Sequence, residues 1–436
     1  MNGDVAMLSW CDLTGLVRCR SVLQDQLSAA GRYGVGWPSA GQAILPFGTV
    51  ADNPWGPLDE VRQVPVGANA MLAARDGWPM FNMVLTRSID RDGRPWDCCP
   101  RSFCEAALGA LRQETGWTML SAFEFEFTRL GEPEVSARPV YTLDAFRTSA
   151  KFFDAAVFAL REAGLDPQTV EPEFGAGQLE IACGPAAGMA GPDRAVMIRE
   201  VLREVARRQD VRITFAPKPA PNEVGNGQHV HFSFIDAAGK PVLYDRDSPA
   251  LISPLASSFV AGIMRHMSAI CAIAAPAPVS YLRLGPHHWS CGYGSFGLQN
   301  REAAIRVCPP ASRDETDRAR AINLEFRPPD GLCNPYLLIG MLAYAGLSGI
   351  RDKLPLPPMV DRDPADLSDE ERRSLSIAPL PASLLEALDA LANDTEARSW
   401  MPPLLHDAFQ SVKRSEIAAV QDKSPEELCA IYRNIY

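Results

Sequence analysis

Asn-Glu-Val-Gly-Asn-Gly-Gln-His-Val-His-Phe-Ser, residues 222–233, is a polar, glycine-rich stretch that runs directly into an expected strand. It contains His229 and His231, and the chain has only six histidines. Because successive side chains of a strand point to opposite faces, both imidazoles are expected on the same face. Imidazole is a common ligand of divalent metals, and glycine-rich backbone can close on an anion or a small substrate. A buried, hydrogen-bonded histidine pair explains the spacing about as well, so both interpretations stay open.

Three further segments place charged side chains on one face of an expected strand. Taken singly, each is typical of an amphipathic strand with a solvated acidic face. Together with the histidine strand they bring many carboxylates to a few strands, and oxygen-rich sets with an occasional histidine favour Mg²⁺ or Mn²⁺ over zinc. Their number predicts a site for two such ions, an arrangement that suits phosphoryl transfer. The residues are Glu124 and Glu126 (in 121–128), Glu173 and Glu180 (in 173–181), and Glu325 and Arg327 (in 323–330).

Composition excludes several classes of protein. A formal net charge of −11 disfavours a nucleic-acid partner. The eleven cysteines include no Cys-x-x-Cys pair, which makes a zinc ribbon or a disulfide framework unexpected and favours a reducing, cytoplasmic compartment. The start of the chain lacks a basic, apolar signal pattern, and the apolar stretch 259–282 is interrupted by Arg265 and His266. We therefore expect no membrane association.

The pattern of apolar residues predicts an α+β protein with an antiparallel sheet rather than a parallel βαβ arrangement. A small, sheet-rich region (1–98) precedes a larger one (99–436). In the first region we expect a hairpin over 5–23, loops over 31–57, and strands at 61–66 and 79–86. The helices are expected at 101–115, 151–164, 193–210, 254–275, 335–353, 383–393, 400–422 and 425–431.

Six motifs, in the same order, resemble the glutamine synthetase family over roughly residues 100–350. They are Glu124-Phe-Glu126, Glu173-Phe-Gly-Ala-Gly-Gln-Leu-Glu180, Phe215-Ala-Pro-Lys218-Pro219, Gly225-Asn-Gly-Gln-His229-Val-His231-Phe-Ser233, Asn300-Arg301 with Arg306, and Glu325-Phe-Arg327-Pro with Asn334-Pro-Tyr336. The resemblance implies an N-terminal β-grasp-like domain (1–98) and a catalytic domain (99–436) with a curved antiparallel sheet. It also implies a ring-shaped, dodecamer-like homo-oligomer whose active sites form between subunits.

The resemblance further implies an ATP-dependent carboxylate–amine ligase. A carboxylate, expected to be glutamate, attacks the γ-phosphate of ATP, and an amine then displaces phosphate from the acyl phosphate. Guanidinium groups and metal ions suit this chemistry because phosphoryl transfer needs charge compensation. The implied residues are Glu126, Glu173 and Glu180 for one metal ion; Glu124, His229 and Glu325 for the other; His231, Ser233, Lys218 and Arg306 for the nucleotide; Arg301, Arg306 and Arg327 for the phosphoryl group; and Arg283 and Gly225 for the carboxylate substrate.

This chain departs from the family pattern where ammonium would bind. Trp289 stands where the family has a flap glutamate, Val224 replaces a substrate-binding asparagine, and no counterpart of the ammonium-binding aspartate is found in 36–41. A bare ammonium ion needs charge and hydrogen bonds, so we expect an organic amine instead.

Trp37 and Trp289 could form an apolar or cation–π wall for that amine. His287 or His288 could act as general base, although either could equally serve only to cap a loop. Two alternatives stay open: a divergent true glutamine synthetase, and a non-catalytic relative that serves as a binding or structural protein.

Overall fold

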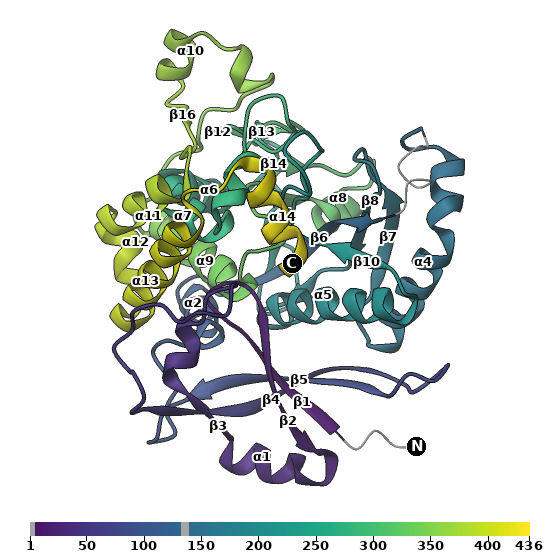
Figure 1. Cartoon of the computed structure of the whole chain (residues 1–436). Coiled ribbons are helices and arrows are strands. Elements are labelled where there is room, and N and C mark those ends of the chain that lie inside the picture. The colour runs from purple at the N-terminus through teal and green to yellow at the C-terminus, as the bar shows by residue number, and fades with distance from the viewer. Residues whose placement is uncertain (1–4, 132–138) are drawn as a thin grey trace.

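The computed structural model describes residues 5–131 and 139–436, and it contains two main sheets (Figure 1). The smaller sheet has five strands in the order β2-β1-β5-β4-β3, and helix α1 (Leu27–Tyr33) packs on it. β1 and β5 run parallel, and the other neighbours are antiparallel. The strands are β1 (Val5–Cys11), β2 (Val17–Leu23), β3 (Val35–Pro38), β4 (Glu60–Leu72) and β5 (Phe81–Ile89).

The expected hairpin over 5–23 is confirmed, since β1 pairs with β2 in antiparallel register. The expectation of loops over 31–57 is wrong in part. This segment contains strand β3 and a short 3₁₀ helix, Ser39–Ala43, in which four of the five residues are buried. The many glycine and proline residues suggested loops, and a strand of four residues has too few side chains to show an alternating pattern.

The larger sheet has nine strands and carries the sequence motifs. Its main path runs β13-β14-β15-β11-β6-β8-β7, and β9 and β10 also pair with β6. Only β13 and β14 are parallel, so the sheet is largely antiparallel and the predicted α+β class is confirmed. The strands are β6 (Thr118–Leu130), β7 (Pro167–Pro172), β8 (Gln178–Cys183), β9 (Ala186–Ala187), β10 (Arg212–Thr214), β11 (Val230–Ile235), β13 (Phe296–Leu298), β14 (Ile305–Cys308) and β15 (Asn323–Phe326).

Alternation along β6 explains why this strand can build a core and a polar face together. Phe123, Phe125 and Phe127 are at most 3% exposed, and they pack against other aromatic rings of the core. The intervening Glu124 and Glu126 must then point to the opposite face. Burial of three phenylalanine side chains stabilises the strand by roughly 1.5–3 kcal/mol each, which offsets the repulsion between the carboxylates.

Helices cover the apolar face of this sheet and form a bundle beside it, and α2 and α5 contact both the sheet and α9 of the bundle (Figure 1). α2, α4 and α5 contact the sheet, whereas α6, α7, α9 and α11 pack on one another. The helices are α2 (Pro100–Thr115), α4 (Leu143–Glu162), α5 (Ala190–Arg208), α6 (Pro254–Arg265), α7 (Met267–Ala274), α8 (Glu315–Ala321), α9 (Pro335–Arg351), α10 (Asp369–Ser374), α11 (Leu384–Asn393), α12 (Thr395–Trp400), α13 (Pro403–Val420) and α14 (Pro425–Ile435).

Several expected helices differ from the observed ones; α5 begins three residues earlier than expected, at Ala190, and α14 extends four residues further, to Ile435. The helix expected over 151–164 begins earlier, because Thr142 caps its N-terminus by accepting a hydrogen bond from the backbone of Ala145. The single helix expected over 254–275 is two helices bent by 75° at His266, whose Nδ1 lies 2.6 Å from Asp394 Oδ2. The helix expected over 400–422 begins only at Pro403, because α12 ends at Trp400.

The turn between β1 and β2 joins the small sheet to α5 and to the segment that leads into α9. Asn334 Nδ2 donates to the backbone oxygen of Asp12 at 2.8 Å, and the buried Arg199 donates both to Gly15 O and to Gly331 O. Gly15 has φ +83°, and a Cβ at this position would lie 1.9 Å from the backbone oxygen of Leu332. Only glycine can fill this position, since it needs both the left-handed backbone and the space.

Among the described residues, no single helix is long and apolar enough to cross a membrane. α6 and α7 satisfy the length and composition requirements only as the bent pair, and most of their side chains are buried. All eleven cysteines are free thiols.

Candidate active site

Six neighbouring strands present the predicted site residues as one row across the large sheet. Arg306 on β14 lies opposite Glu325 on β15, which in turn lies opposite His231 on β11. On the other side of β6, Glu126 faces Glu180 of β8, and Glu180 faces Glu171 of β7. Like charges directly opposite one another destabilise a sheet. The row therefore costs folding free energy and calls for a positive ligand.

The first cluster of the row combines two histidines with two carboxylates. His231 Nε2 lies 2.9 Å from Glu124 Oε1, and His229 Nδ1 lies 3.1 Å from Glu124 Oε2. His229 Nδ1 is also 3.6 Å from Glu325 Oε1. Glu124, His231 and Glu325 each offer one ligand atom within 4.8 Å of the others. The structure thus brings Glu124, His229 and Glu325 together as predicted, and it adds His231.

The second cluster contains three carboxylates, Glu171, Glu173 and Glu180, whose ligand atoms also lie within 4.8 Å of one another. Glu173 Oε2 accepts a hydrogen bond of 2.7 Å from the hydroxyl of Tyr141. Glu126 was predicted in this group, whereas Glu171 was not. The signal was present, because Glu171 stands two residues before Glu173 on the same side of an extended segment.

Glu126 lies between the two clusters. Its Oε2 accepts hydrogen bonds from the backbone of Gly227 at 2.8 Å and from Gln178 Nε2 at 2.9 Å. Its other oxygen, Oε1, lies 3.7 Å from His229 Nδ1. Backbone and amide donors therefore fix one oxygen and leave the other directed towards the histidine.

Electrostatics distinguish the two clusters. Burial and the neighbouring Glu124 and Glu126 raise the pKa of Glu180 to about 10. Burial alone would also raise the pKa of Glu325, but Arg327 and the two histidines outweigh it and hold that pKa at about 2. The carboxylate cluster around Glu180 therefore lacks compensating positive charge, whereas the cluster around Glu325 is balanced by protein groups.

Divalent metal ions fit these residues. The donor set is mostly carboxylate oxygen with histidine at one end, which matches the preferences of Mg²⁺ and Mn²⁺. The raised pKa of Glu180 shows that the cluster would release repulsion on binding a cation. All of these candidate metal ligands come from one chain.

The glycine-rich stretch closes over a buried arginine. A Cβ on Gly225 would lie 2.8 Å from the Arg283 side chain, and a Cβ on Gly227 would lie 2.7 Å from an Arg283 guanidinium nitrogen. Arg283 is 3% exposed and donates to the backbone oxygens of Pro328 (2.9 Å) and Arg327 (3.2 Å). The glycines are needed because any side chain would displace this guanidinium. The binding of a substrate carboxylate by Arg283 stays a prediction.

The predicted phosphate-binding arginines differ in their surroundings. Arg306 donates to Glu325 Oε2 at 2.7 Å, and Arg327 donates to Glu325 Oε1. Arg301 is exposed and makes no hydrogen bond or ion pair within residues 5–131 and 139–436. The structure therefore places two of the three predicted arginines beside the predicted metal ligand Glu325 and leaves the third facing outwards.

The residues predicted for the nucleotide lie along and beside β11. His231 and Ser233 share one face of this strand, because Val230, Phe232 and Phe234 between them are buried on the other. Lys218 is largely buried, its ammonium group donates to the backbone oxygen of Glu223, and burial lowers its pKa. Their contacts with a nucleotide stay a prediction.

The segment around Trp289 is an outward-facing loop held at its base. His287, Trp289 and Cys291 all have positive φ, between 51° and 63°. The Trp289 backbone N–H donates to Glu302 Oε1 at 2.8 Å, and its carbonyl accepts from Arg327. The indole itself is 63% exposed. The backbone of this flap is thus tied to Arg327, the arginine beside Glu325, while the indole of Trp289 faces outwards.

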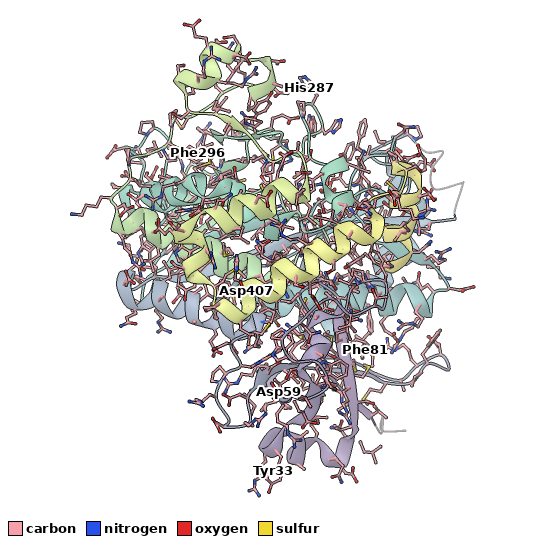
Figure 2. All side chains as sticks on the ribbon, turned by 60° about the vertical axis from the view of Figure 1, so that its left-hand side comes forward. Tyr33, Asp59, Phe81, His287, Phe296 and Asp407 are labelled. Carbon is pink, nitrogen blue, oxygen red and sulfur yellow. The ribbon has the colours of Figure 1, made fainter. Side chains whose placement is uncertain are left out.

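The two histidines of the flap have different partners. His287 Nδ1 lies 2.9 Å from Asp363 Oδ2, whereas His288 turns back towards Gly285 and makes no hydrogen bond with another described residue. His287 stands at the end of the molecule opposite Tyr33 and Asp59 (Figure 2). Sequence reasoning did not find Asp363, because the two residues are 76 positions apart.

Trp37, which we expected to join Trp289 in a wall for the amine, lies in the five-stranded sheet. Its ring packs edge-on against Trp10 at a centroid distance of 4.8 Å, and it covers Gly41. Within one chain Trp37 therefore contributes to the core of the small sheet, while Trp289 is on the flap.

Comparison with known proteins shows the family to which this chain belongs. Residues 97–430 match the family model described as glutamine synthetase, catalytic domain. The chain belongs to the glutamine synthetase family. A solved structure described as a novel glutamine synthase homolog superposes with a TM-score of 0.92 at 36% identity, covering 100% of this chain and 99% of that one.

Similar proteins of the glutamine synthetase family carry names that indicate different products. The gamma-glutamylpolyamine synthetase GlnA3 of Streptomyces coelicolor is 30% identical over 98% of this chain and 92% of its own length. The glutamine synthetase of Methanocaldococcus jannaschii is 31% identical over 74% of this chain and 71% of its own. This glutamine synthetase-family chain is accordingly an ATP-dependent carbon–nitrogen ligase.

Proposed function

We propose that this ligase joins the γ-carboxylate of glutamate to an organic amine rather than to ammonia. The observation that carries the proposal is the exposed Trp289 on a flap whose backbone is bonded to Arg327. An indole offers an apolar or cation–π surface to an alkyl or polyamine chain, and it offers no charge to ammonium. The similarity over 98% of the chain to a gamma-glutamylpolyamine synthetase supports the same amine class.

The first step is phosphoryl transfer. A carboxylate oxygen of glutamate attacks the γ-phosphorus of ATP, the bond to the β-phosphate oxygen breaks, and ADP leaves. Arg327 and Arg306, both beside Glu325, would compensate the charge that develops on the transferring group. Mg²⁺ or Mn²⁺, when bound by the Glu124–His229–Glu325 and Glu126–Glu173–Glu180 groups with Glu171 and His231, would supply further positive charge.

The second step is amide formation. The amine nitrogen attacks the acyl carbon, the carbon–oxygen bond to phosphate breaks, and the nitrogen loses a proton. We assign the acceptance of this proton to His287 rather than His288, because Asp363 fixes the orientation of its imidazole through Nδ1 and leaves Nε2 free. Asp363 is then a positioning residue, as carboxylates beside catalytic histidines commonly are.

Release of ADP in the presence of ATP, Mn²⁺ and glutamate tests the proposed function, with ammonium and alkyl, poly- and arylamines compared side by side. We expect turnover that depends on one organic amine class. A best response to ammonium would make the protein a glutamine synthetase with an unusual flap. If no amine causes ADP release, the proposed reaction is refuted, and either another carboxylate substrate or a non-catalytic protein is favoured.

Matched variants test the base. His287→Gln should lower kcat about 100-fold, and the loss should shrink at high pH where the amine is already deprotonated. His288→Gln should leave kcat within about threefold, as a surface change does. Equal losses in the two variants would contradict the assignment to His287.

We also propose that the enzyme works as a ring-shaped, dodecamer-like homo-oligomer with active sites between subunits. Such an arrangement would let Trp37 of one subunit approach the flap of another, since within one chain Trp37 lies in the small sheet. Mass photometry of the purified protein tests the assembly. A monomer with full activity would refute it.

A further inference from the structure

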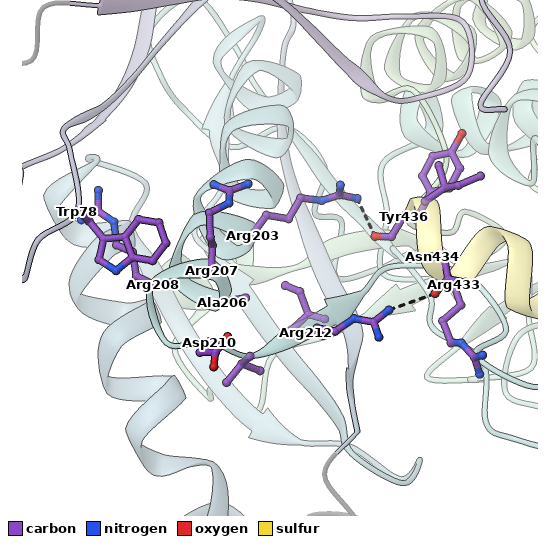
Figure 3. Close-up of a pocket in the computed structure, with 13 residues that line it drawn as sticks. Trp78, Arg203, Ala206, Arg207, Arg208, Asp210, Arg212, Arg433, Asn434 and Tyr436 are labelled. Carbon is purple, nitrogen blue, oxygen red and sulfur yellow. Dashed lines mark hydrogen bonds between the residues drawn. The ribbon is translucent and has the colours of Figure 1, made fainter. Parts of the chain in front are cut away.

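A depression rich in arginine lies away from the row of carboxylates. It has a volume of about 740 Å³ and is formed where the end of α5, strand β10, the end of α14 and the turn between β4 and β5 meet (Figure 3). Five of its lining residues are arginines and only one, Asp210, has an acidic side chain. The arginines are Arg203, Arg207, Arg208, Arg212 and Arg433.

Basic residues at the end of a helix are common, because they interact favourably with its dipole. That explanation covers Arg207 and Arg208, which end α5 and share the single carboxylate of Glu204. It does not cover Arg212 and Arg433, which come from β10 and α14 and converge on the same depression.

Arg212 and Arg433 have no carboxylate partner among the described residues. Arg212 donates to the neutral side-chain oxygen of Asn434 at 3.1 Å, and Arg433 donates to the backbone oxygen of Pro219 at 3.1 Å. Figure 3 shows the Arg212 contact and the contact from Arg203 to the backbone oxygen of Tyr436. Each guanidinium carries five N–H donors, so several donors of Arg212 and Arg433 stay available to a ligand.

Arg203 shows that positive charge is in excess here. Its nearest carboxylate side chain, Glu200, lies 3.8 Å away and is shared with Arg199 at 3.7 Å, and Arg203 also donates to the terminal oxygen of Tyr436 at 2.7 Å. Burial, and beyond it the charges of Arg199 and Arg207, lower the pKa of Arg203 below its usual value. An anion in the depression would relieve this repulsion.

Trp78 adds an aromatic wall at the edge of the depression (Figure 3). It follows a two-residue turn in which Asp76 and Gly77 both have positive φ, as the tight turn of a hairpin requires. Arg208 holds this hairpin against α5 by donating to the backbone oxygens of Ala73 and Pro79, each at 3.1 Å. The hairpin that carries Trp78 is therefore fixed to Arg208 and the end of α5.

We propose that this depression binds a small molecule bearing a polyphosphate group, of the nucleoside di- or triphosphate class. The forked guanidinium groups of Arg212 and Arg433 match phosphate oxygens, and Trp78 provides a surface on which a base stacks. None of the residues that line it belongs to the predicted reaction site. It is a second site, linked to that one through β10, which pairs with the Thr128–Leu130 end of β6.

Calorimetric titration of the full chain with inorganic tripolyphosphate, in EDTA, tests the polyphosphate part. Arg212→Gln/Arg433→Gln should weaken the binding about tenfold or more, because charge-assisted bonds are lost. Arg91→Gln, an exposed arginine paired with Asp59 elsewhere, should bind as the wild type does. Arg306→Gln should retain this binding, because Arg306 lies in the reaction site.

The Arg212→Lys/Arg433→Lys variant keeps both charges and guards against a folding defect. It should bind more weakly than wild type but more tightly than the glutamine variant, since an ammonium group cannot form the fork. The base is tested with ADP in the Arg306→Gln background, where Trp78→Ala should weaken ADP but not tripolyphosphate.

Three results would overturn the proposal. One is no binding of tripolyphosphate to the wild type, and another is loss of binding in Arg306→Gln alone, which would place the anion in the reaction site. The third is a change in subunit association in the glutamine variant without any binding by the wild type, which would make the depression an interface between copies.

Discussion

Replacing Glu180 by glutamine should make the metal-free protein more stable while impairing metal binding. Glu180 is 9% exposed and faces Glu126 and Glu171 across the sheet. Burial and the neighbouring carboxylates raise its pKa from 4.5 to about 10, so at neutral pH the folded metal-free protein holds a proton that the unfolded chain releases. Glutamine has nearly the same shape and needs no proton.

The size of the expected stabilisation follows from the difference between the working pH and the pKa of the carboxyl group in the unfolded chain. At pH 7 the cost is set by the distance from the ordinary value of 4.5, and at roughly 1.4 kcal/mol per pH unit it amounts to about 3 kcal/mol. It does not depend on how far above 7 the folded pKa lies. A raised carboxyl pKa gives stability that is fully present below 4.5 and is lost as the pH rises towards 10. The advantage of the variant should therefore grow with pH across this range.

Thermal unfolding in EDTA, at fixed protein concentration and at about pH 5 and pH 7, measures the effect. For a chain of this length, 3 kcal/mol corresponds to an increase in Tm of about 3 °C. Glu171→Gln is the matched control, because Glu171 is exposed and its change should stay within about 0.5 kcal/mol. Added Mn²⁺ should stabilise the wild type more than Glu180→Gln. A variant less stable than wild type in EDTA at pH 7 would refute the reasoning.

Three further predictions concern single positions. Glu325→Ala should reduce ADP release by about 1000-fold or more, because Arg306 and Arg327 lose their shared partner and a metal ligand is removed; substantial residual turnover would contradict this. Trp289→Glu should raise the ratio of kcat/KM for ammonium to that for the preferred organic amine about tenfold, with Trp289→Gln as the uncharged control, and an unchanged ratio would count against the flap interpretation. Lys413→Met should lower the free energy of urea unfolding by about 3–5 kcal/mol, since it leaves Glu416 charged and buried. Lys423→Met, which breaks only an exposed pair, should change it by less than about 1 kcal/mol.

Local patterns in the sequence predicted the parts of the site that lie within single strands. The alternation of phenylalanine and glutamate on β6, and the two histidines on β11, already determine which face each side chain takes. The glycines at 225 and 227 signalled a close approach, and the structure shows Arg283 as the group that comes close.

Such patterns could not predict contacts between residues that are far apart in the sequence. The break at His266 depends on Asp394, which is 128 positions away, and a helical periodicity cannot show it. The orientation of His287 likewise depends on Asp363. Arg301 belongs to a recognisable motif, yet its side chain faces outwards, because a motif records residue types and not the direction of a loop side chain.

The joint at the β1–β2 turn means that the border of the family match at residue 97 is no place to cut the chain. Without the turn, the guanidinium of Arg199 would lose its contact with Gly15 inside the protein, and Asn334 would lose Asp12. Fragments that begin near residue 97 should therefore aggregate or require chaperones rather than fold as independent units. The contacts at this turn also mean that the two regions must evolve together. A substitution in the β1–β2 turn requires a matching substitution near Arg199 or Asn334.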